Sequence, residues 1–172
     1  MKNKILKVSF LNHLNSLKWM FLLAILYYLF VYFLLGSLFS ENQSSLYSFL
    51  HLYILIQLII VLYIHFSYYL KNKNSNFRIE GNNIFDVENN KSINSSEIGK
   101  IIIHKSYALT AGKMAFFPFQ HYKYCEVILK NGDVLIFTSL LNNNIDDFLK
   151  ENIKGVLFEN DFSPFCYFYN KH

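Results

Sequence analysis

Two long runs without a charged residue constrain the fold of this chain more than any other feature. They cover residues 19–39 and 46–70, which are 21 and 25 residues long. An α-helix needs about 20 apolar residues to cross the hydrocarbon core of a bilayer. Each run is therefore predicted to form a transmembrane helix. The first run is too long for the core of a signal peptide, and no small-residue cleavage site follows it, so we expect a retained anchor.

The short linker between the runs, residues 40–45, predicts an antiparallel helical hairpin with both chain ends on one side of the membrane. Residues 1–18 contain four lysines, residues 71–78 contain two lysines and an arginine, and neither segment contains an acid. The linker contains Glu41 as its only charged residue. Because basic residues favour the cytoplasmic side, we expect a multi-pass protein of the cell inner (plasma) membrane with both termini in the cytoplasm.

The basic segment 1–18 carries apolar residues at helical spacing. Two interpretations are open. The segment forms a cytoplasmic amphipathic helix in the membrane interface, or it extends the first transmembrane helix into the cytoplasm. The apolar positions are Ile5, Leu6, Phe10, Leu11, Leu14 and Leu17.

After the hairpin, residues 76–172 are predicted to form a small cytoplasmic β domain. Its first two strands flank the turn-forming sequence Glu80-Gly81-Asn82-Asn83, and the β-branched run 98–107 predicts a third strand. Between them, residues 88–96 are rich in Asn and Ser and are expected to form a turn region. The two strands of the first hairpin are residues 77–79 and 84–87.

The sequence Asn131-Gly132 gives the most specific local prediction. Asn-Gly between two apolar strands favours a two-residue type I′ turn, because both turn positions need a positive φ. This turn would place Leu129 opposite Val134, and Cys125 opposite Thr138. The face predicted to be buried consists of Cys125, Val127, Leu129, Val134, Ile136 and Thr138.

A short helix is predicted over residues 145–153. An asparagine precedes it, Asp146 and Asp147 lie in its first turn, and Gly155 follows it, as expected for a helix with N- and C-terminal signals. Its apolar residues form one stripe that would close over the sheet. The tail, residues 156–172, is aromatic but has no pattern that places it.

This order of elements, with the run YCEVILKNGDVLIFTSLL (residues 124–141), resembles the bacterial membrane-anchored proteins with a pleckstrin-homology-like (PH-like) domain. The resemblance covers roughly residues 19–155. It implies a membrane α-helical hairpin followed by a small α+β domain, in which a bent antiparallel sheet is capped by a C-terminal helix. Phosphoinositide-binding members of the wider superfamily carry a basic cluster between their first two strands. The loop taken to correspond, residues 80–83, has only Arg78 nearby, so the resemblance does not imply an inositol-phosphate site.

Patterns for catalysis or metal binding are not found in the sequence. There is no Gly-rich phosphate loop, no histidine pair with metal spacing and no nucleophile elbow. A metal site made of His104, His121 and Cys125 is not expected, because Cys125 is predicted to face the core. Cys125 and Cys166 are expected to be packing residues in a reducing compartment. We therefore predict a protein that is not an enzyme and holds no cofactor.

The charge distribution bears on the partners. Residues 79–172 carry nine lysines against eleven acids, so the net charge of +4 comes from the membrane flanks. Nucleic acid is therefore not an expected partner. The expected partners are the lipid bilayer and either another protein or a second copy of this chain.

The aromatic sequence Phe116-Phe117-Pro118-Phe119 has three open interpretations. It is part of the core, a lip that touches the bilayer, or a docking surface for a protein or apolar ligand. Three lysines surround it and favour contact with anionic headgroups. The candidate membrane or partner contacts are Phe116, Phe117, Phe119, Lys105, Lys113 and Lys123.

Polar residues inside the predicted spans are His51, Gln57 and His65. Both histidines lie close to the ends of the second span, and Gln57 lies near its middle. A hydrogen bond from Gln57 to the other helix is expected, and a transport path is not, because one hairpin encloses no pore.

Together these features predict a non-enzymatic binding or assembly module, anchored in the inner membrane, that presents a small β domain at the cytoplasmic face. The alternative is a subunit of a larger membrane complex, such as a transporter accessory or an immunity-type protein, that acts through its transmembrane hairpin.

Overall fold

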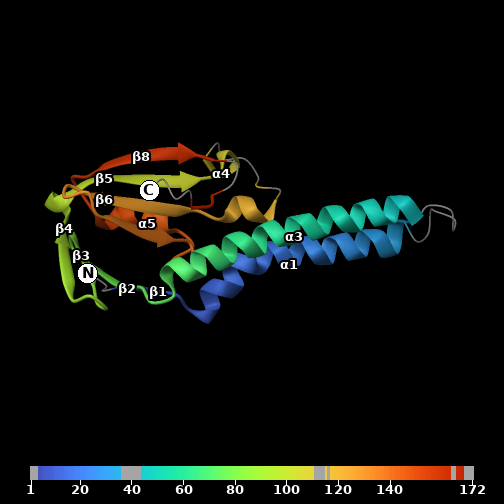
Figure 1. Cartoon of the computed structure of the whole chain (residues 1–172), viewed down its shortest axis with the longest axis horizontal. Helices are drawn as coiled ribbons and strands as arrows, with labels where there is room; N and C mark the ends of the chain where they lie inside the picture. Colours follow the sequence, from blue (N-terminus) through green and yellow to red (C-terminus); the bar gives the residue numbers. More distant parts are fainter. Residues whose placement is uncertain (1–3, 36–43, 111–114, 116, 164–165, 169–172) are drawn as a thin grey trace.

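In the computed structural model, the residues described are 4–35, 44–110, 115, 117–163 and 166–168. A long helical hairpin projects from a domain of two β-sheets (Figure 1). The hairpin consists of α1 (Phe10–Phe30), the π-helix η1 (Val31–Leu35) that continues it, and α3 (Ser44–Asn72).

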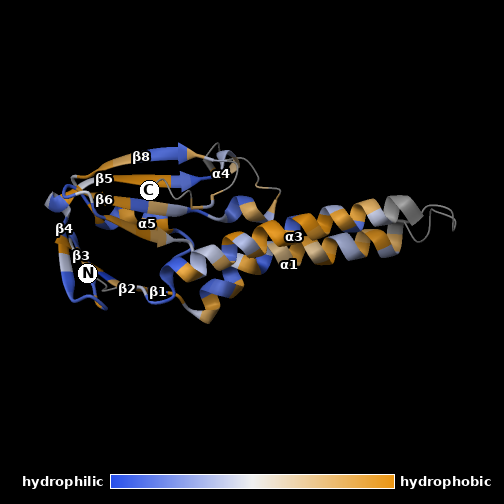
Figure 2. Cartoon of the chain, in the orientation of Figure 1, coloured by the Kyte–Doolittle hydropathy of each residue, from blue (hydrophilic) through white to orange (hydrophobic). Residues whose placement is uncertain are grey.

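The hairpin helices have the length and composition of membrane-spanning helices. The segments Phe10–Phe33 and Ser48–Asn72 are both long and apolar enough to cross a bilayer. Figure 2 shows hydrophobic residues along the hairpin and more hydrophilic residues at the end that meets the β domain. The polar end therefore faces the β domain, and the apolar length extends away from it.

The hairpin is inserted between two neighbouring strands. β1 (Lys4–Lys7) pairs antiparallel with β2 (Asn76–Glu80), so Leu6 lies opposite Phe77. Leu6 is 1% exposed and belongs to the core of the β domain. The prediction of a helix through Ile5 and Leu6 is wrong, and a domain that begins at residue 76 lacks its first strand. A four-residue strand carries too little periodicity to be separated from the helix that follows, and its partner lies far along the chain.

Two four-stranded sheets make up the β domain. The first has the order β1-β2-β3-β4, and the second has the order β7-β6-β5-β8. All pairings are antiparallel except that β8 runs parallel to β5. The other strands are β3 (Asn83–Asp86), β4 (Lys91–Asn94), β5 (Ile98–Lys105), β6 (Tyr124–Leu129), β7 (Val134–Thr138) and β8 (Leu157–Phe162).

The predicted first hairpin and third strand are confirmed as β2, β3 and β5. Besides β1, two further strands, β4 and β8, were not predicted. β4 lies within the segment predicted as a turn region, where Ile93 is fully buried opposite Ile84. β8 lies in the tail, and its place beside β5 depends on a parallel pairing that leaves no local signal in the sequence.

The β6–β7 hairpin differs from its predicted register by one residue. Cys125 lies opposite Phe137 instead of Thr138. The N–H of Leu129 donates to the carbonyl of Asp133, so three residues form the loop instead of two. The last of them, Gly132, has a φ of +93°, which a glycine adopts without strain.

This slip exchanges the two faces of β7, because side chains alternate along a strand. Phe137 is completely buried, whereas Val134 is 38% exposed. The predicted core face is therefore confirmed on β6. On β7 it is wrong for Val134, whereas Thr138 is buried as predicted.

The core of the β domain lies between the two sheets and α5 (Ile145–Asn152). This helix confirms the predicted one, although the side chain of Asn144 makes no capping hydrogen bond. Core members include Ile79, Ile84, Ile101, Val127, Phe137 and Leu149.

A second buried cluster joins the hairpin to the β domain. It combines α3, the 3-10 helix η3 (Pro118–His121), the start of β6 and Cys166. Its buried members are Val61, Ile64, Tyr68, Phe119, Tyr122, Tyr124, Leu140 and Cys166. We call this cluster and the polar contacts around it the junction.

Candidate functional site

Two asparagines at the junction attach the hairpin to the edge strand β7 and to the loop that follows it. Asn72, at the end of α3, donates its side-chain N–H to the carbonyl of Ile136 at 2.9 Å and accepts from the N–H of Thr138 at 3.1 Å. Asn12 of α1 donates to the carbonyls of Leu140 at 2.8 Å and Leu141 at 3.2 Å. The amide of Asn72 thus occupies the place that a neighbouring strand would take.

A chain of polar rings crosses the junction. Nδ1 of His13 lies 2.8 Å from Nε2 of His65, and Nδ1 of His65 lies 2.9 Å from the hydroxyl of Tyr122. Burial raises the pKa of Tyr122, so the phenol keeps its proton. Each of these two hydrogen bonds needs one proton. With neutral rings, the donors can all point from His13 toward Tyr122 or all from Tyr122 toward His13. These contacts link α1, α3 and the β domain.

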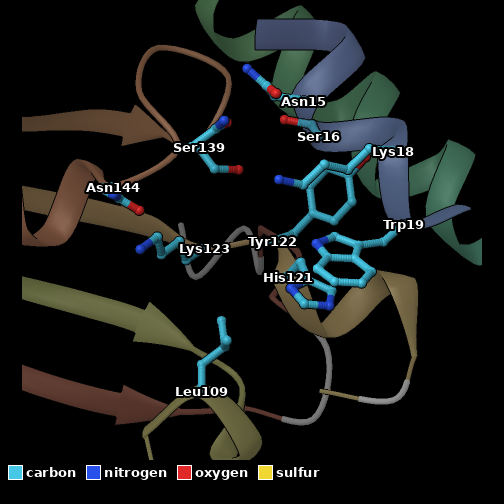
Figure 3. Close-up of a pocket in the computed structure, with 11 residues that line it drawn as sticks. Asn15, Ser16, Lys18, Trp19, Leu109, His121, Tyr122, Lys123, Ser139 and Asn144 are labelled. Atoms are coloured by element: carbon cyan, nitrogen blue, oxygen red, sulfur yellow. The ribbon is translucent and has the colours of Figure 1, made fainter. Parts of the chain in front are cut away.

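A hollow of about 210 Å³ opens beside these contacts, between α1, η3 and the loop after β7 (Figure 3). Figure 3 shows Trp19 and His121 on one side of the hollow, and Lys123 and Asn144 on the opposite side. Its polar lining consists mainly of Asn15, Ser16, Lys18, Lys123, Ser139 and Asn144.

The Trp19–His121 pair forms one wall of the hollow. Their ring centroids are 4.5 Å apart with an interplanar angle of 7°, and Nζ of Lys18 lies 5.7 Å from the centroid of the Trp19 ring. Burial lowers the pKa of His121, and the charge of Lys18 lowers it further, against an opposing hydrogen bond with the backbone of Ala115. His121 is therefore neutral near pH 7.

Lys123, on the opposite wall, belongs to a cluster of charged side chains with excess positive charge. Lys123 and Lys105 both pair with Asp146, the latter at 3.7 Å, and the three side chains are only 12%, 15% and 6% exposed. Burial alone would raise the pKa of Asp146, but the hydrogen bond and charge of Lys123, with the charge of Lys105, hold it below its usual value. Two ammonium groups therefore share one carboxylate.

Two serine hydroxyls at the hollow lack a partner. The Oγ atoms of Ser139 and Ser16 are buried, and neither makes a hydrogen bond within the residues that the structure describes. Ser139 is 4% exposed, and only its backbone N–H is used, by the carbonyl of Lys123. A buried hydroxyl without a partner costs free energy unless a ligand or water supplies one.

A comparison with protein families matches residues 5–151 to the PH domain. The chain belongs to the PH domain family. No curated protein matches the chain. PH domains are typically non-catalytic binding modules. The hollow is therefore a candidate binding site.

The family match includes the helical hairpin, since it begins at β1 and ends in α5. In this PH domain the connection between the first two strands, β1 and β2, is therefore the hairpin itself. The sequence comparison that assigned residues 80–83 to this connection is wrong, because these residues join β2 to β3. The basic residue nearest the hollow on the true connection is Lys18.

The predicted contact residues of this PH domain lie at different depths. Phe119 is 8% exposed and packs in the junction, and Phe117 stacks on it at 5.4 Å. Lys105 and Lys123 meet at Asp146. Phe116 and Lys113 lie outside the described residues.

Other residues singled out in the sequence do not reach the hollow. Gln57 is half-buried on α3, and its Oε1 has no hydrogen-bond partner among the described residues. Nδ1 of His104 lies 2.9 Å from Asp161, and its ring stacks on Tyr124. Within the described ranges, no three His, Cys, Asp or Glu side chains gather as metal ligands would.

The sequence analysis did not predict that Trp19, His121 and Ser139 would be neighbours. They come from three separate segments, α1, η3 and the end of β7, so no spacing rule brings them together.

Proposed function

We propose that this PH domain protein is a membrane-anchored binding module whose hairpin crosses the bilayer and holds the β domain at the membrane surface. The hairpin works as a rigid stalk, because β1 before α1 and β2 after α3 are paired in the same sheet. Tethering in this way raises the effective concentration of the domain for partners at the membrane.

The distribution of buried residues carries this proposal. Of the most apolar 18 residues of each helix, only 11% and 17% are buried inside the structure. A core helix of a soluble protein would be mostly buried, whereas these two expose large apolar side chains along their length. Exposed examples are Phe21, Ile25, Leu26, Leu52, Leu55, Ile59 and Leu62.

The charged and aromatic residues support the same orientation. Lys18 and Trp19 lie in the half of α1 that is nearer the β domain, and Tyr69 and Lys71 lie in the last turn of α3. Aromatic rings and lysines favour the membrane interface, with the lysines on the cytoplasmic side. The hollow would then lie at the depth of the headgroups, and the β domain in the cytoplasm.

Cysteine labelling tests this topology. Cys125 and Cys166 are buried free thiols, so single cysteines at Glu41→Cys and Lys130→Cys are expected to dominate the reaction with a membrane-impermeant maleimide. In intact cells, Glu41→Cys should react and Lys130→Cys should react only after permeabilisation. Equal reaction of the two sites in intact cells would rule out a spanning hairpin with this orientation.

A second candidate function is favoured by the exposed apolar side chains of the hairpin. They can pack against another membrane protein or a second copy of this chain, as expected for a subunit of a larger complex. Exchanging only residues 22–59 for an unrelated hairpin keeps the junction intact, because its contacts on the helices come from residues outside this range. Loss of the native crosslinked partners in this chimera would support the second candidate, and their retention would support the first.

A further inference from the structure

We propose that the outer face of the second sheet binds a lysine- or arginine-rich segment that adjoins a membrane span of another membrane protein. The preference for a basic, partly apolar segment stands on the geometry of this face alone. That the segment adjoins a membrane span rests on the proposed function, under which the face lies at the cytoplasmic membrane surface.

A wide groove lies on this face, on the side of the sheet away from α5 and the core. It has a volume of about 1340 Å³ and is bordered by the end of α3 and by residues 166–168. Small-molecule sites usually have volumes of roughly 300 to 1,000 Å³, so this groove suits a polypeptide segment better. Its lining on the sheet includes Ile102, Glu126, Ile128, Val134, Ile136, Glu159 and Asp161.

Aliphatic and acidic side chains alternate across the groove. Glu126 of β6 lies between Ile136 of β7 and Ile102 of β5 in one row across the sheet. Ile102 in turn lies between Glu126 and Glu159 of β8. Asp161 lies two residues beyond Glu159 on β8 and therefore on the same face. A segment that alternates cationic and apolar side chains would complement this row.

The charge of the face favours a cationic partner. Glu126, Glu159 and Asp161 supply three carboxylates. The lysines beside them are Lys71, which borders the groove at the end of α3, and Lys100, which pairs with Glu159. Three carboxylates against two ammonium groups leave one negative charge on the face.

The ion pairs of these carboxylates leave acceptor sites open. Nζ of Lys100 lies 2.8 Å from Glu159, and Nδ1 of His104, which is charged only when protonated, lies 2.9 Å from Asp161. The side chains of Glu159 and Asp161 are still 43% and 59% exposed. Since a carboxylate has about four acceptor sites, both can also accept from a lysine or arginine of a partner.

Neither lipid nor a second copy complements this face. The cytoplasmic surface of a membrane is negatively charged and repels the three carboxylates. In a symmetric dimer through this face, the carboxylates of one copy would meet those of the other. Lysines and arginines are enriched in cytoplasmic segments that flank membrane spans. Such segments are therefore the basic partners closest to the face in the proposed orientation.

The first test uses the full chain in a non-ionic detergent, with a fluorescein-labelled octapeptide of alternating lysine and leucine as the probe. We expect its fluorescence anisotropy to rise to saturation as protein is added, and the affinity to fall as the salt concentration rises. An octapeptide of alternating glutamate and leucine should not bind. Binding of both peptides alike, or of neither, would overturn the proposal.

Two double variants make this test specific. Glu159→Gln with Asp161→Asn removes two charges from the face and should weaken binding of the lysine peptide about fivefold, as expected for two partly exposed ion pairs. Asp147→Asn with Glu151→Gln changes the net charge equally, at exposed positions of α5, and should bind the peptide like the wild type. Equal affinity of the two double variants would also overturn the proposal.

Crosslinking in the native membrane tests where the basic segment lies. A photo-crosslinking residue replaces Val134, which is 38% exposed in the groove, or Ile5, which is 57% exposed on the other sheet and serves as the control. From Val134 alone we expect crosslinks to lysine- and arginine-rich segments that adjoin a membrane span. Their yield should fall when Glu159→Gln and Asp161→Asn are added.

The other outcomes separate the proposal from the membrane anchor. Crosslinks to a second copy, to lipid alone or to segments without basic residues would overturn the proposal, and crosslinks to basic segments far from any span would overturn their membrane location. If the lysine peptide binds but Glu41→Cys is not labelled in intact cells, the proposed function fails and the preference of the face for a basic segment is retained.

Discussion

The side chain of Asn72 accepts a hydrogen bond from the backbone N–H of Thr138 at 3.1 Å, while its own amide donates to the carbonyl of Ile136. Asn72 is 1% exposed and lies at the end of α3. The amide thus covers the edge of β7 and fixes the angle at which the hairpin leaves the β domain. An open strand edge would otherwise present unpaired backbone groups.

Replacing Asn72 should therefore loosen the junction. Asn72→Ala leaves the carbonyl of Ile136 and the N–H of Thr138 without partners. We expect a loss of about 2 to 6 kcal/mol in the free energy of unfolding, at about 1 to 3 kcal/mol for each unsatisfied group. Denaturant unfolding of the full chain in detergent measures it. Asn74→Ala, two residues on and exposed, is the matched control and should change stability by less than about 0.5 kcal/mol. Equal stability of the two variants would contradict the role given to Asn72.

The first strand gives a second prediction through two adjacent residues. Leu6 is 1% exposed and Ile5 is 57% exposed. Leu6→Ala should destabilise the β domain by about 2 to 5 kcal/mol, and Ile5→Ala should have little effect. The same unfolding measurement checks it. Similar losses at both positions would favour a membrane-bound helix over a strand.

A fragment of residues 76–172 should be less stable than the full chain, because it lacks β1.

The register of the β6–β7 hairpin gives a third prediction. In the observed register Phe137 is buried and Val134 is 38% exposed. Phe137→Ala should cost about 3 to 5 kcal/mol, whereas Val134→Ala should stay within about 0.5 kcal/mol of the wild type. Thermal unfolding followed by circular dichroism compares them. The two-residue turn would reverse this order, since it buries Val134 and exposes Phe137.

The pH dependence of the Trp19–His121 stack gives a fourth prediction. The pKa of His121 is lowered by burial and by the charge of Lys18. In the unfolded chain His121 takes up its proton near its usual pKa of about 6.5. Its contribution to stability is therefore complete above pH 6.5 and is lost as the pH falls toward the lowered pKa of the folded state.

Removing the charge of Lys18 should raise the pKa of His121. The expected result for Lys18→Met is a Trp19 fluorescence titration whose midpoint lies at higher pH than in the wild type. Lys73→Met serves as the control and should titrate like the wild type. A titration that is identical in all three proteins would show that Lys18 does not act on His121.

The sequence by itself determined the elements whose signal is local. Charge-free apolar runs of about 20 residues favour long helices. Both helices and the hairpin that they form therefore followed from the sequence alone. Strands β2, β3, β5 and β6 and helix α5 were predicted from alternation, turn residues and end signals. The same signals placed Cys125 and Val127 on the buried face of β6.

Only the tertiary structure decided what depends on distant partners. β1 and β8 are strands because β2 and β5 offer them hydrogen bonds, and neither short segment carries that information itself. The register of β7 was set by the packing of Phe137 in the core, which outweighed the preference of Asn-Gly for a two-residue turn. The hollow exists because Lys18, His121 and Ser139, from three separate segments, meet where the hairpin is inserted into the PH domain.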